Sequence, residues 1–489
     1  MKRLLMLVVA VVGLAAGAVP SAALAMPSEP DVVPDELIVQ YQDGASAQQQ
    51  AAARERVHAV PKSEIGAAAE QHGRLEVAQL PSGSDVWAAA KELERDPNVL
   101  YAEPNILYHA GPVITAKQPG GSGTTTAPLT CSACNDTIFT NDWMWGTFNT
   151  SGVYDALGGY HANQYGSQAD EAWANGTTGS RSIAVGVIDE GIDLNHPDLA
   201  PNIWTNPNDT ADGADNDGNG YTDDLHGWNF VDNNNQIYTP GADDHGTHVA
   251  GTIGAQGGNG QFVAGINWNV QLIDAKFLDA SGSGTLENAL RALNYLVDLK
   301  VNHGVNLVAV NNSWGCSGSG CYSKSMQDAI NRAARANIMF IAAAGNNGTN
   351  NDATPEYPAN YSSLTNGATV GAASYDNVIS VAALDEYGKR PSWSDYGKHT
   401  VDIAAPGAGI LSTVPGTNGD YSNAVANYSG TSMATPHVTG AVALYVSTHP
   451  GATGAQIRNA LLSSATATSS MNRVTVTNGR LNIAAMLTK

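Results

Sequence analysis

Short apolar runs alternate with amphipathic segments over the carboxy-terminal three quarters of the chain. The runs, rich in β-branched residues, lie at 183–188, 270–277, 305–310, 338–344 and 378–382. Helical patterns such as 286–300 and 325–336 lie between them. Continuous apolar strands separated by helices predict a mostly parallel sheet covered on both faces. We therefore expect a three-layer α/β domain over residues 131–489.

A smaller unit precedes this domain. Its pattern predicts strands at 36–42, 75–80 and 99–102 and helices at 46–60 and 85–95. The order strand, helix, strand, helix, strand predicts a ferredoxin-like α+β unit over 34–109. Residues 110–130 are rich in Gly, Thr and Pro and offer little to bury, which indicates an exposed linker.

The first residues indicate export. Lys2 and Arg3 precede an apolar run over 4–19, and Ala23 and Ala25 supply the small residues of a cleavage site. The run is shorter than a membrane-spanning helix, so we expect a signal peptide over 1–25 rather than a membrane anchor. The sequence thus predicts a secreted, extracellular protein.

Charge and cysteine content limit the classes of partner and indicate the state of the cysteines. The formal net charge of −22 argues against nucleic-acid binding, which needs a basic face. An acidic surface can attract metal cations or basic partners, but we interpret most of these carboxylates as solvated surface charge. The four cysteines form two close pairs, Cys131 with Cys134 and Cys316 with Cys321. Export favours two local disulfides, and zinc ligation by all four thiolates is the alternative.

Three segments carry the chemistry of a nucleophilic hydrolase. They are Val-Ile-Asp-Glu-Gly-Ile-Asp ending at 193, His-Gly-Thr-His-Val-Ala-Gly-Thr beginning at 245, and Gly-Thr-Ser-Met-Ala-Thr-Pro-His-Val beginning at 430. A serine hydroxyl needs a base to take its proton, and a buried carboxylate fixes the tautomer of that base. Ser432 opens an apolar helical stretch, whose amino terminus favours a developing oxyanion.

These segments, in the order Asp, His, Ser, resemble the signatures of the subtilisin-like serine peptidases. The resemblance implies a subtilisin-like domain in which Asp189, His245 and Ser432 are catalytic and His248 is structural. It implies that Asn346, in Ala-Ala-Ala-Gly-Asn, donates to the oxyanion. Residues 99–105 resemble the end of the family's inhibitory propeptide, so the chain's own amino-terminal unit is the expected intramolecular inhibitor.

The resemblance also implies a set of substrate-binding residues. Protein or peptide substrates would lie as an added strand along an edge segment, between the two walls of the S1 pocket. The edge segment is Gly282, Ser283 and Gly284, and the walls are Ser313, Trp314 and Gly315 on one side and Ala343, Ala344 and Gly345 on the other.

Glu356 stands where the resemblance implies the floor of the S1 pocket, a position at which many relatives have a small residue. We hypothesise that it favours Lys or Arg at P1, the residue before the scissile bond. An unpaired charge in a dry pocket is costly, and a basic side chain would pair with it. Alternatively Glu356 points to water, and the enzyme has broad specificity with an apolar or aromatic preference.

Two calcium sites are expected. Residues 215–224 resemble the opening of an EF-hand loop, with Gly220 at its sixth position. The twelfth position is His226 rather than Glu, so a truncated calcium loop is predicted, with an acidic surface turn as the alternative. Its expected ligands are Asp215, Asp217, Asn219, Tyr221, Asp223 and Asp224. The resemblance alone implies a second structural calcium site at Asp136, Asp198 and Asn259.

The sequence as a whole predicts a monomeric, calcium-stabilised serine endopeptidase that works through an acyl-enzyme and is made as a self-processing precursor. A lipase or esterase would need Gly-x-Ser-x-Gly, which residues 430–434 do not match. A calcium-binding surface protein on a protease-like fold is the alternative outside enzymes.

Overall fold

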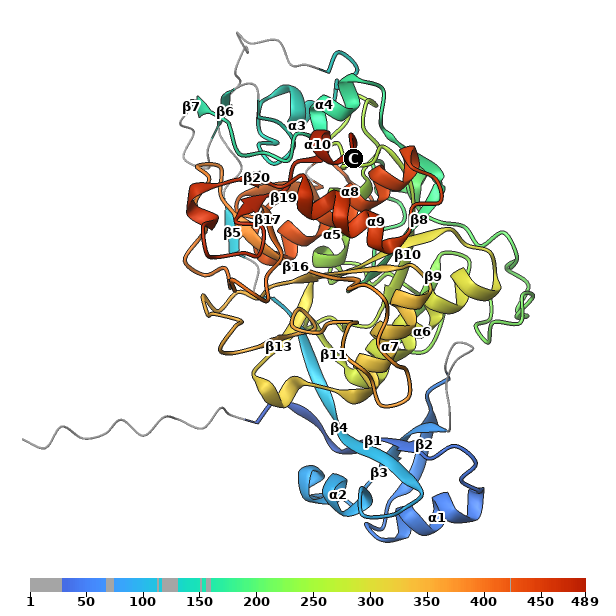
Figure 1. The fold of residues 1–489 in the computed structure, drawn as a ribbon. Coiled ribbons are helices and arrows are strands. Elements are labelled where there is room, and N and C mark those ends of the chain that lie inside the picture. The colour runs from blue at the N-terminus through green and yellow to red at the C-terminus, as the bar shows by residue number, and fades with distance from the viewer. Residues whose placement is uncertain are drawn as a thin grey trace, which may run out of the picture.

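The computed structural model describes residues 29–66, 74–111, 114–116, 131–149, 152–154, 160–422 and 424–489. The predicted signal peptide, residues 1–25, lies outside these residues. Figure 1 shows a small unit below a larger domain, with the long strand β4 (Val99–Ala110) running from one into the other.

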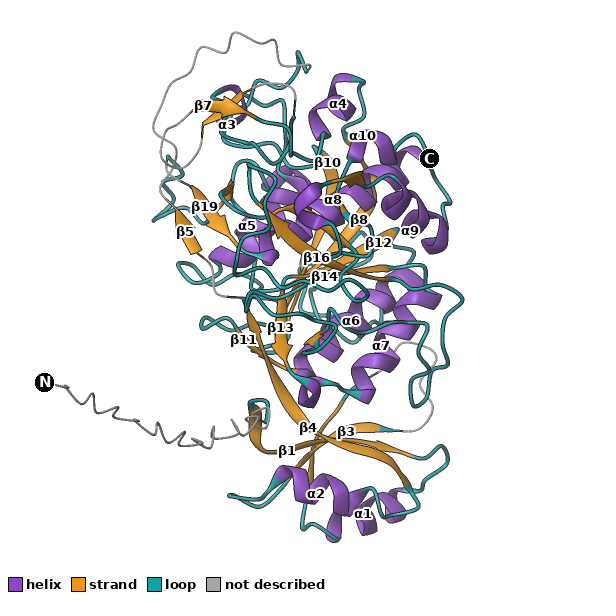
Figure 2. Cartoon of the chain, turned by 60° about the vertical axis from the view of Figure 1, so that its left-hand side comes forward, coloured by secondary structure: helices purple, strands orange, loops and turns teal. Residues whose placement is uncertain are grey.

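The small unit has the predicted ferredoxin-like arrangement. Its antiparallel strands have the order β2, β3, β1, β4, and Figure 2 shows both helices on the side of this sheet that faces away from the large domain. The sequence pattern did not predict β2, because its only large apolar side chain, Val60, is exposed. The helix predicted at 46–60 ends earlier, at Glu55. The elements are β1 (Val32–Tyr41), α1 (Ala47–Glu55), β2 (Val60–Glu64), β3 (Leu75–Gln79) and α2 (Val86–Leu93).

A nine-stranded sheet forms the centre of the large domain. Its order is β20, β21, β17, β16, β14, β12, β8, β10, β9, and every pair except β20 with β21 is parallel. The five predicted strands are its middle members. The strands are β8 (Gly179–Ile188), β9 (Gly227–Asn229), β10 (Asn269–Lys276), β12 (Leu307–Asn312), β14 (Met339–Ala343), β16 (Val378–Leu384), β17 (Ile403–Pro406), β20 (Thr466–Ala467) and β21 (Gly479–Arg480).

Helices cover both faces of this sheet, as predicted. Side chains of a strand alternate between its faces. On β8, Val185 and Val187 join one apolar cluster with residues of α5 and α8, whereas Ala184 and Ile188 join another with residues of α6 and α7. The three-layer prediction is therefore confirmed. These helices are α5 (Asp244–Gly254), α6 (Leu286–Asn302), α7 (Lys324–Arg335) and α8 (Thr431–Thr448).

Strand β4 extends well beyond the predicted 99–102. Its first half pairs with β1, and its second half lies between β11 (Ser283–Thr285) and β13 (Trp314–Ser317) of the large domain, antiparallel to both. The backbone supplies these pairings, so the side-chain pattern of the sequence did not reveal them. The small unit thereby sends an extended segment across the large domain.

The small unit also supplies acceptors to the amino termini of α6 and α7. The buried carboxylate of Glu103 accepts from the backbone N–H of Lys324 at 2.8 Å and of Ser325 at 3.1 Å. Asn105 Oδ1 accepts from the N–H of Glu287 at 3.1 Å. Free N–H groups at a helix amino terminus favour such acceptors. These contacts fix the position of β4 on the large domain.

Part of the predicted linker, 110–130, is structured. Ala110 ends β4, and β5 (Ile114–Ala116) pairs with β19 (Val425–Ser429), which pairs with β18 (Ile410–Thr413). Residues 117–130 lie outside the described part of the chain. The strand at 114–116 was not predicted, because backbone pairing requires few apolar side chains, and its Ile114 is 47% exposed.

The remaining elements are short and surround these layers. They are α3 (Thr137–Thr140), β6 (Gly152–Tyr154), β7 (Tyr160–Ala162), α4 (Ala169–Ala174), η1 (Ala200–Asn202), η2 (Ser319–Cys321), β15 (Glu356–Tyr357), α9 (Gly454–Ser463), η3 (Ser469–Met471) and α10 (Ile483–Met486). Both predicted disulfides are present, Cys131–Cys134 and Cys316–Cys321. The second closes the turn that follows β13.

Candidate active site

The predicted catalytic residues meet at the carboxyl edge of the parallel sheet. Asp189 follows β8 directly, and Asn346 lies three residues after β14. His245 and Ser432 lie in the first turns of α5 and α8, two helices that pack against each other. Strand ends and helix amino termini converge at such an edge in open α/β sheets, which explains why distant segments form one site.

Asp189 and His245 form a buried pair. Asp189 Oδ1 is 2.7 Å from His245 Nδ1, and the two residues are 0% and 3% exposed. His245 Nε2 has no hydrogen-bond partner among the described residues. Burial alone would lower the pKa of His245, but the charge and hydrogen bond of Asp189, followed by the charge of Glu190, raise that pKa to about 9.

Ser432 is held in the first turn of α8. Its Oγ donates to the backbone carbonyl of Ser313 at 3.2 Å, and Ser313 Oγ donates to the carbonyl of Ser432 at 3.0 Å. The Ser432 hydroxyl must therefore release the Ser313 carbonyl before it can donate its proton to a base. Serine hydroxyls turn readily about one torsion, so this requires no backbone change.

Asn346 presents its amide N–H₂ to the site. Its Oδ1 accepts from the Thr431 N–H and from the Thr431 hydroxyl, each at 2.9 Å. Because Oδ1 accepts both of these bonds, Nδ2 points toward Gly111 and lies where it would contact a Cβ at that residue. The side chain is therefore oriented as a donor toward the same point as the amino terminus of α8.

The segment across the cleft is the end of β4. Pairing joins Tyr108 to Gly284 of β11 and His109 to Gly315 of β13, and the Ala110 N–H donates to the Gly282 carbonyl at 2.8 Å. A Cβ at Gly111 would lie 3.4 Å from Ser432 Oγ. The predicted edge segment and the Ser313–Gly315 wall thus enclose one extended strand and bring its end to Ser432.

Below Gly111 lies a cavity of about 320 Å³. Glu356 lines it and is 6% exposed, so it does not point into bulk water. Burial, and then the nearby charge of Asp395, raise the pKa of Glu356 to about 8, and a hydrogen bond from Ser317 opposes this shift. The predicted wall residues also line the cavity, namely Ser313, Trp314, Gly315, Ala343 and Gly345. Ala344 is fully buried and does not line it.

Two acidic residues of the site were not predicted from the sequence. Glu190 follows Asp189 and accepts from the His245 N–H at 3.1 Å, while Asp395 meets Glu356 beneath Gly345. Because Glu190 directly follows Asp189 in the sequence, its presence at the site could have been predicted. No local sequence pattern predicts Asp395, which the fold alone places beside Glu356, behind the pocket wall.

The second histidine of the His-x-x-His segment lies outside the site, as predicted. His248 Nε2 lies 3.1 Å from the Ile410 carbonyl, and its ring stacks on Tyr428. Burial lowers the pKa of His248 to about 3, so it remains neutral.

The predicted calcium loop is only partly brought together. Asn206 Nδ2 donates to both Asp217 and Asp224, and Asn219 Nδ2 does the same, so these two carboxylates converge. Asp215 instead accepts from the N–H groups of Gly218 and Gly220. Of the other predicted ligands, Asp223 accepts from two N–H groups at 212 and 213, and the Tyr221 ring packs among aromatic side chains.

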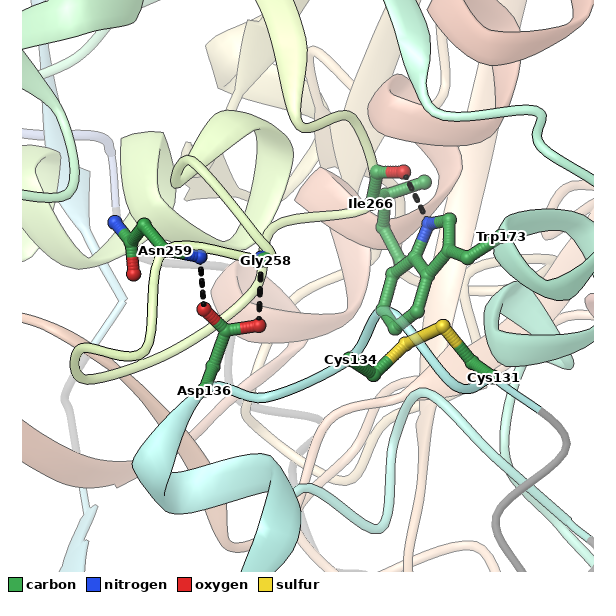
Figure 3. Close-up of a disulfide and its surroundings, with 7 residues drawn as sticks. All are labelled: Cys131, Cys134, Asp136, Trp173, Gly258, Asn259 and Ile266. Carbon is green, nitrogen blue, oxygen red and sulfur yellow. Dashed lines mark hydrogen bonds between the residues drawn. A yellow bond between two sulfur atoms is a disulfide. The ribbon is translucent and has the colours of Figure 1, made fainter.

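At the second predicted calcium site, all three predicted residues are joined by hydrogen bonds. Figure 3 shows Asp136 pointing at the loop that contains Gly258 and Asn259, whose N–H groups donate to it at 2.8 and 3.2 Å. Asp198 accepts from Asn259 Nδ2 at 2.9 Å. Burial raises the pKa of Asp136, and burial with the charge of Asp136 raises that of Asp198 to about 6.

Neither carboxylate of this second site has a cationic partner in the described residues, which fits a bound cation. The described part of the chain contains no group of three or more His, Cys, Asp or Glu side chains with the geometry of a metal site. Ligation here would therefore draw on amide and backbone oxygens, which calcium accepts.

Comparison with known proteins identifies the family. The family model of the subtilases matches residues 180–480, and the family model of the fervidolysin N-terminal prodomain matches residues 18–105. The chain belongs to the subtilase family. It is a subtilisin-like serine protease with an N-terminal prodomain.

Individual relatives agree with this assignment. The chain is 32% identical over 433 residues to the thermophilic serine proteinase of Bacillus sp. (strain AK1), covering 88% of this subtilase and 81% of that protein. It is 33% identical to thermitase of Thermoactinomyces vulgaris, covering 62% of this chain and 88% of that one. Fervidolysin from Fervidobacterium pennivorans shares the fold, with a TM-score of 0.67 and 21% identity over 94% of this chain and 61% of fervidolysin.

Proposed function

We propose that this subtilase is a secreted serine endopeptidase that hydrolyses protein substrates through an acyl-enzyme and is made as a self-processing precursor. The observation that carries the proposal is strand β4, which lies between β11 and β13 and ends at Ala110, so that the next residue, Gly111, lies beside Ser432 and Asn346. A protease that binds substrate by strand addition needs this path for a backbone. We propose a signal peptide at 1–25, a propeptide over 34–109 and a peptidase domain over 131–489.

The proposed mechanism assigns a step to each polar group. Ser432 Oγ attacks the carbonyl carbon while His245 Nε2 takes its proton, and Asp189 orients the ring and stabilises the imidazolium. Asn346 Nδ2 and the Ser432 N–H donate to the oxyanion. The C–N bond then breaks as His245 returns the proton to the leaving amine. Water attacks the acyl-enzyme by the same route and releases the acid.

The first test is digestion of a peptide library by the self-processed protein, with Ser432→Ala as the control. We expect internal cleavages by the wild type and none by the variant. If the wild type, with propeptide removal verified by mass spectrometry, cleaves nothing, the endopeptidase proposal is wrong and a binding function replaces it. Cleavage after Lys or Arg would support the P1 role proposed for Glu356.

Glu190→Gln should move the acid limb of the kcat/KM profile to lower pH. The charge of Glu190 stabilises the His245 imidazolium, so removing it lowers the pKa of His245 from its value of about 9. A base must be neutral, and a lower pKa gives more neutral His245 at a given pH. Profiles from about pH 5 to pH 11 would measure the shift. An unmoved limb, or one at higher pH, would contradict the assignment.

We further propose that calcium stabilises the folded protein, held at Asp136, Asp198 and Asn259 and at the loop that contains Asp217 and Asp224. Chelation should lower Tm by roughly 5–10 °C, the effect of losing a ligand present at about 100 times its Kd. Asp198→Asn should shrink the difference between calcium-loaded and chelated protein. An equal difference in wild type and variant would exclude this site as the source.

No helix in the described part of the subtilase combines the length and apolar composition needed to cross a bilayer. The positively charged start and the apolar run over 4–19 support the proposed export.

A further inference from the structure

The strand in the cleft identifies which residue faces which subsite. Gly111 is the residue beside Ser432 Oγ, so it stands at P1, and Ala110 stands at P2. A Cβ built on Gly282 would lie 3.4 Å from Ala110 Cβ and 3.7 Å from Glu190 Oε1. Both atoms therefore adjoin the same point above Gly282. Ala110 Cβ and Glu190 Oε1 are therefore at most about 7 Å apart (3.4 Å plus 3.7 Å), a span that a lysine or arginine side chain at residue 110 can cover.

Glu190 is a buried acid without a cationic partner. It is 5% exposed, and no salt bridge joins it to a lysine or arginine in the described residues. Its Oε2 accepts from the backbone N–H of His245, whereas Oε1 is the oxygen nearer to Ala110. The charged residues facing it are His245, Asp189 and Asp244. Two of these three are acids, so the subsite has a strongly negative potential.

Glu356 lines the S1 cavity, and a second buried acid, Asp395, lies behind the cavity wall beneath Gly345. Glu356 Oε2 and Asp395 Oδ2 are buried and have no hydrogen-bond partner in the described residues. Asp395 Oδ2 and Glu356 Cγ are the atoms that approach the position of a Cβ on Gly345. Asp395 Oδ1 is satisfied by the N–H groups of Asn347 and Thr349. A planar guanidinium can donate to both oxygens of one carboxylate such as that of Glu356, which an ammonium does less well, and the nearby charge of Asp395 adds to the negative potential.

We propose that this protease selects two consecutive basic residues, with arginine at P1 held by Glu356, whose pocket Asp395 makes more negative, and lysine or arginine at P2 held by Glu190. This inference rests on the proposed endopeptidase function and specifies its substrate class. The strand now in the cleft presents alanine and glycine at these two positions, the smallest side chains. It leaves both groups of carboxylates uncompensated, so a dibasic peptide should gain contacts that the propeptide lacks.

Four fluorogenic peptides that differ only in P2–P1 test the proposal: Arg-Arg, Ala-Arg, Arg-Ala and Ala-Ala. The self-processed enzyme should cleave Arg-Arg about 10- to 100-fold better than Ala-Arg in kcat/KM, the effect of one charge-assisted hydrogen bond. Each value should come from the plateau of its own pH profile, because Glu190→Gln also moves the acid limb. The substrate Ala-Ala reports turnover without either charge.

Variants assign each preference to its carboxylate. Glu190→Gln should abolish the P2 preference and retain the P1 preference, and Glu190→Asp should retain part of it. Glu356→Gln and Asp395→Asn should each weaken the preference for P1 arginine and retain the P2 preference. Asp298→Asn removes a charge on α6 that neither lines the cavity nor adjoins Glu190, and should change neither ratio.

The outcomes separate the inference from the function on which it rests. If no peptide is cleaved by processed enzyme, the endopeptidase proposal fails. If all four are cleaved at similar rates, that proposal stands and the dibasic inference is overturned. A P2 preference that survives Glu190→Gln unchanged overturns the role of Glu190. A P1 preference for apolar residues overturns the role of Glu356 and Asp395.

Discussion

Replacing Ser432 by alanine should lower kcat by about 10⁶-fold with little change in KM, as measured for the nucleophile of a subtilisin. Ser432 is 1% exposed, and its hydroxyl makes one hydrogen bond, to the Ser313 carbonyl. Alanine therefore removes the attacking oxygen without enlarging the pocket or disturbing α8. The full-length Ser432→Ala chain should also remain uncut. Initial rates on one fluorogenic peptide and the mass of the purified protein would measure both effects.

The control for this result is Ser412→Ala. Ser412 is another buried serine, and its hydroxyl donates to the His248 carbonyl at 2.7 Å rather than entering the cleft. Its loss should change kcat by less than about tenfold, the scale of one neutral hydrogen bond. His245→Ala should match Ser432→Ala, and the double variant should be no slower, because the two residues act as one unit. Additive losses would show that they act separately.

The sequence predicted the parts of the site that lie on regular elements. Apolar runs at 183–188 and 338–344 identify buried strands, and the residues that follow them must meet at one sheet edge. This places Asp189 and Asn346 near each other without any contact information. Ser432 is equally predictable, because an apolar helical stretch follows it and its hydroxyl comes in the first turn.

The sequence did not predict the contacts that depend on tertiary geometry. The end of β4 pairs through its backbone, so 107–111 carried no side-chain signal for lying in the cleft. Asp395 reaches Glu356 only because the loop after β16 folds beneath Gly345. The EF-hand pattern predicted Asp215 and Asp223 as ligands, but in the structure backbone N–H groups already satisfy them. Local spacing identifies candidate oxygens and does not determine which of them converge.

Asn346→Ala should lower kcat by about 10²–10³-fold and leave KM nearly unchanged, as measured when a subtilisin loses its oxyanion asparagine. Thr431 engages Oδ1 twice, so the amide is held with Nδ2 toward the cleft before any substrate binds. A donor fixed in this way does not reorganise during the reaction, and its benefit arises as negative charge develops on the oxygen. The kcat and KM of a single peptide, measured for wild type and variant, distinguish this from ground-state binding.

Thr431→Val is the matched variant, because it removes one of the two bonds that orient Asn346 while leaving Nδ2 in place. It retains the backbone N–H that donates to Oδ1 at 2.9 Å, so kcat should fall by less than in Asn346→Ala. Combined with Asn346→Ala, it should cause only a small further loss, from the bond that the Gly345 N–H donates to Thr431 Oγ1 at 3.2 Å, since the rest of its effect passes through Asn346. A rise in KM at constant kcat for Asn346→Ala would instead mean that the amide binds the substrate carbonyl and the oxyanion equally.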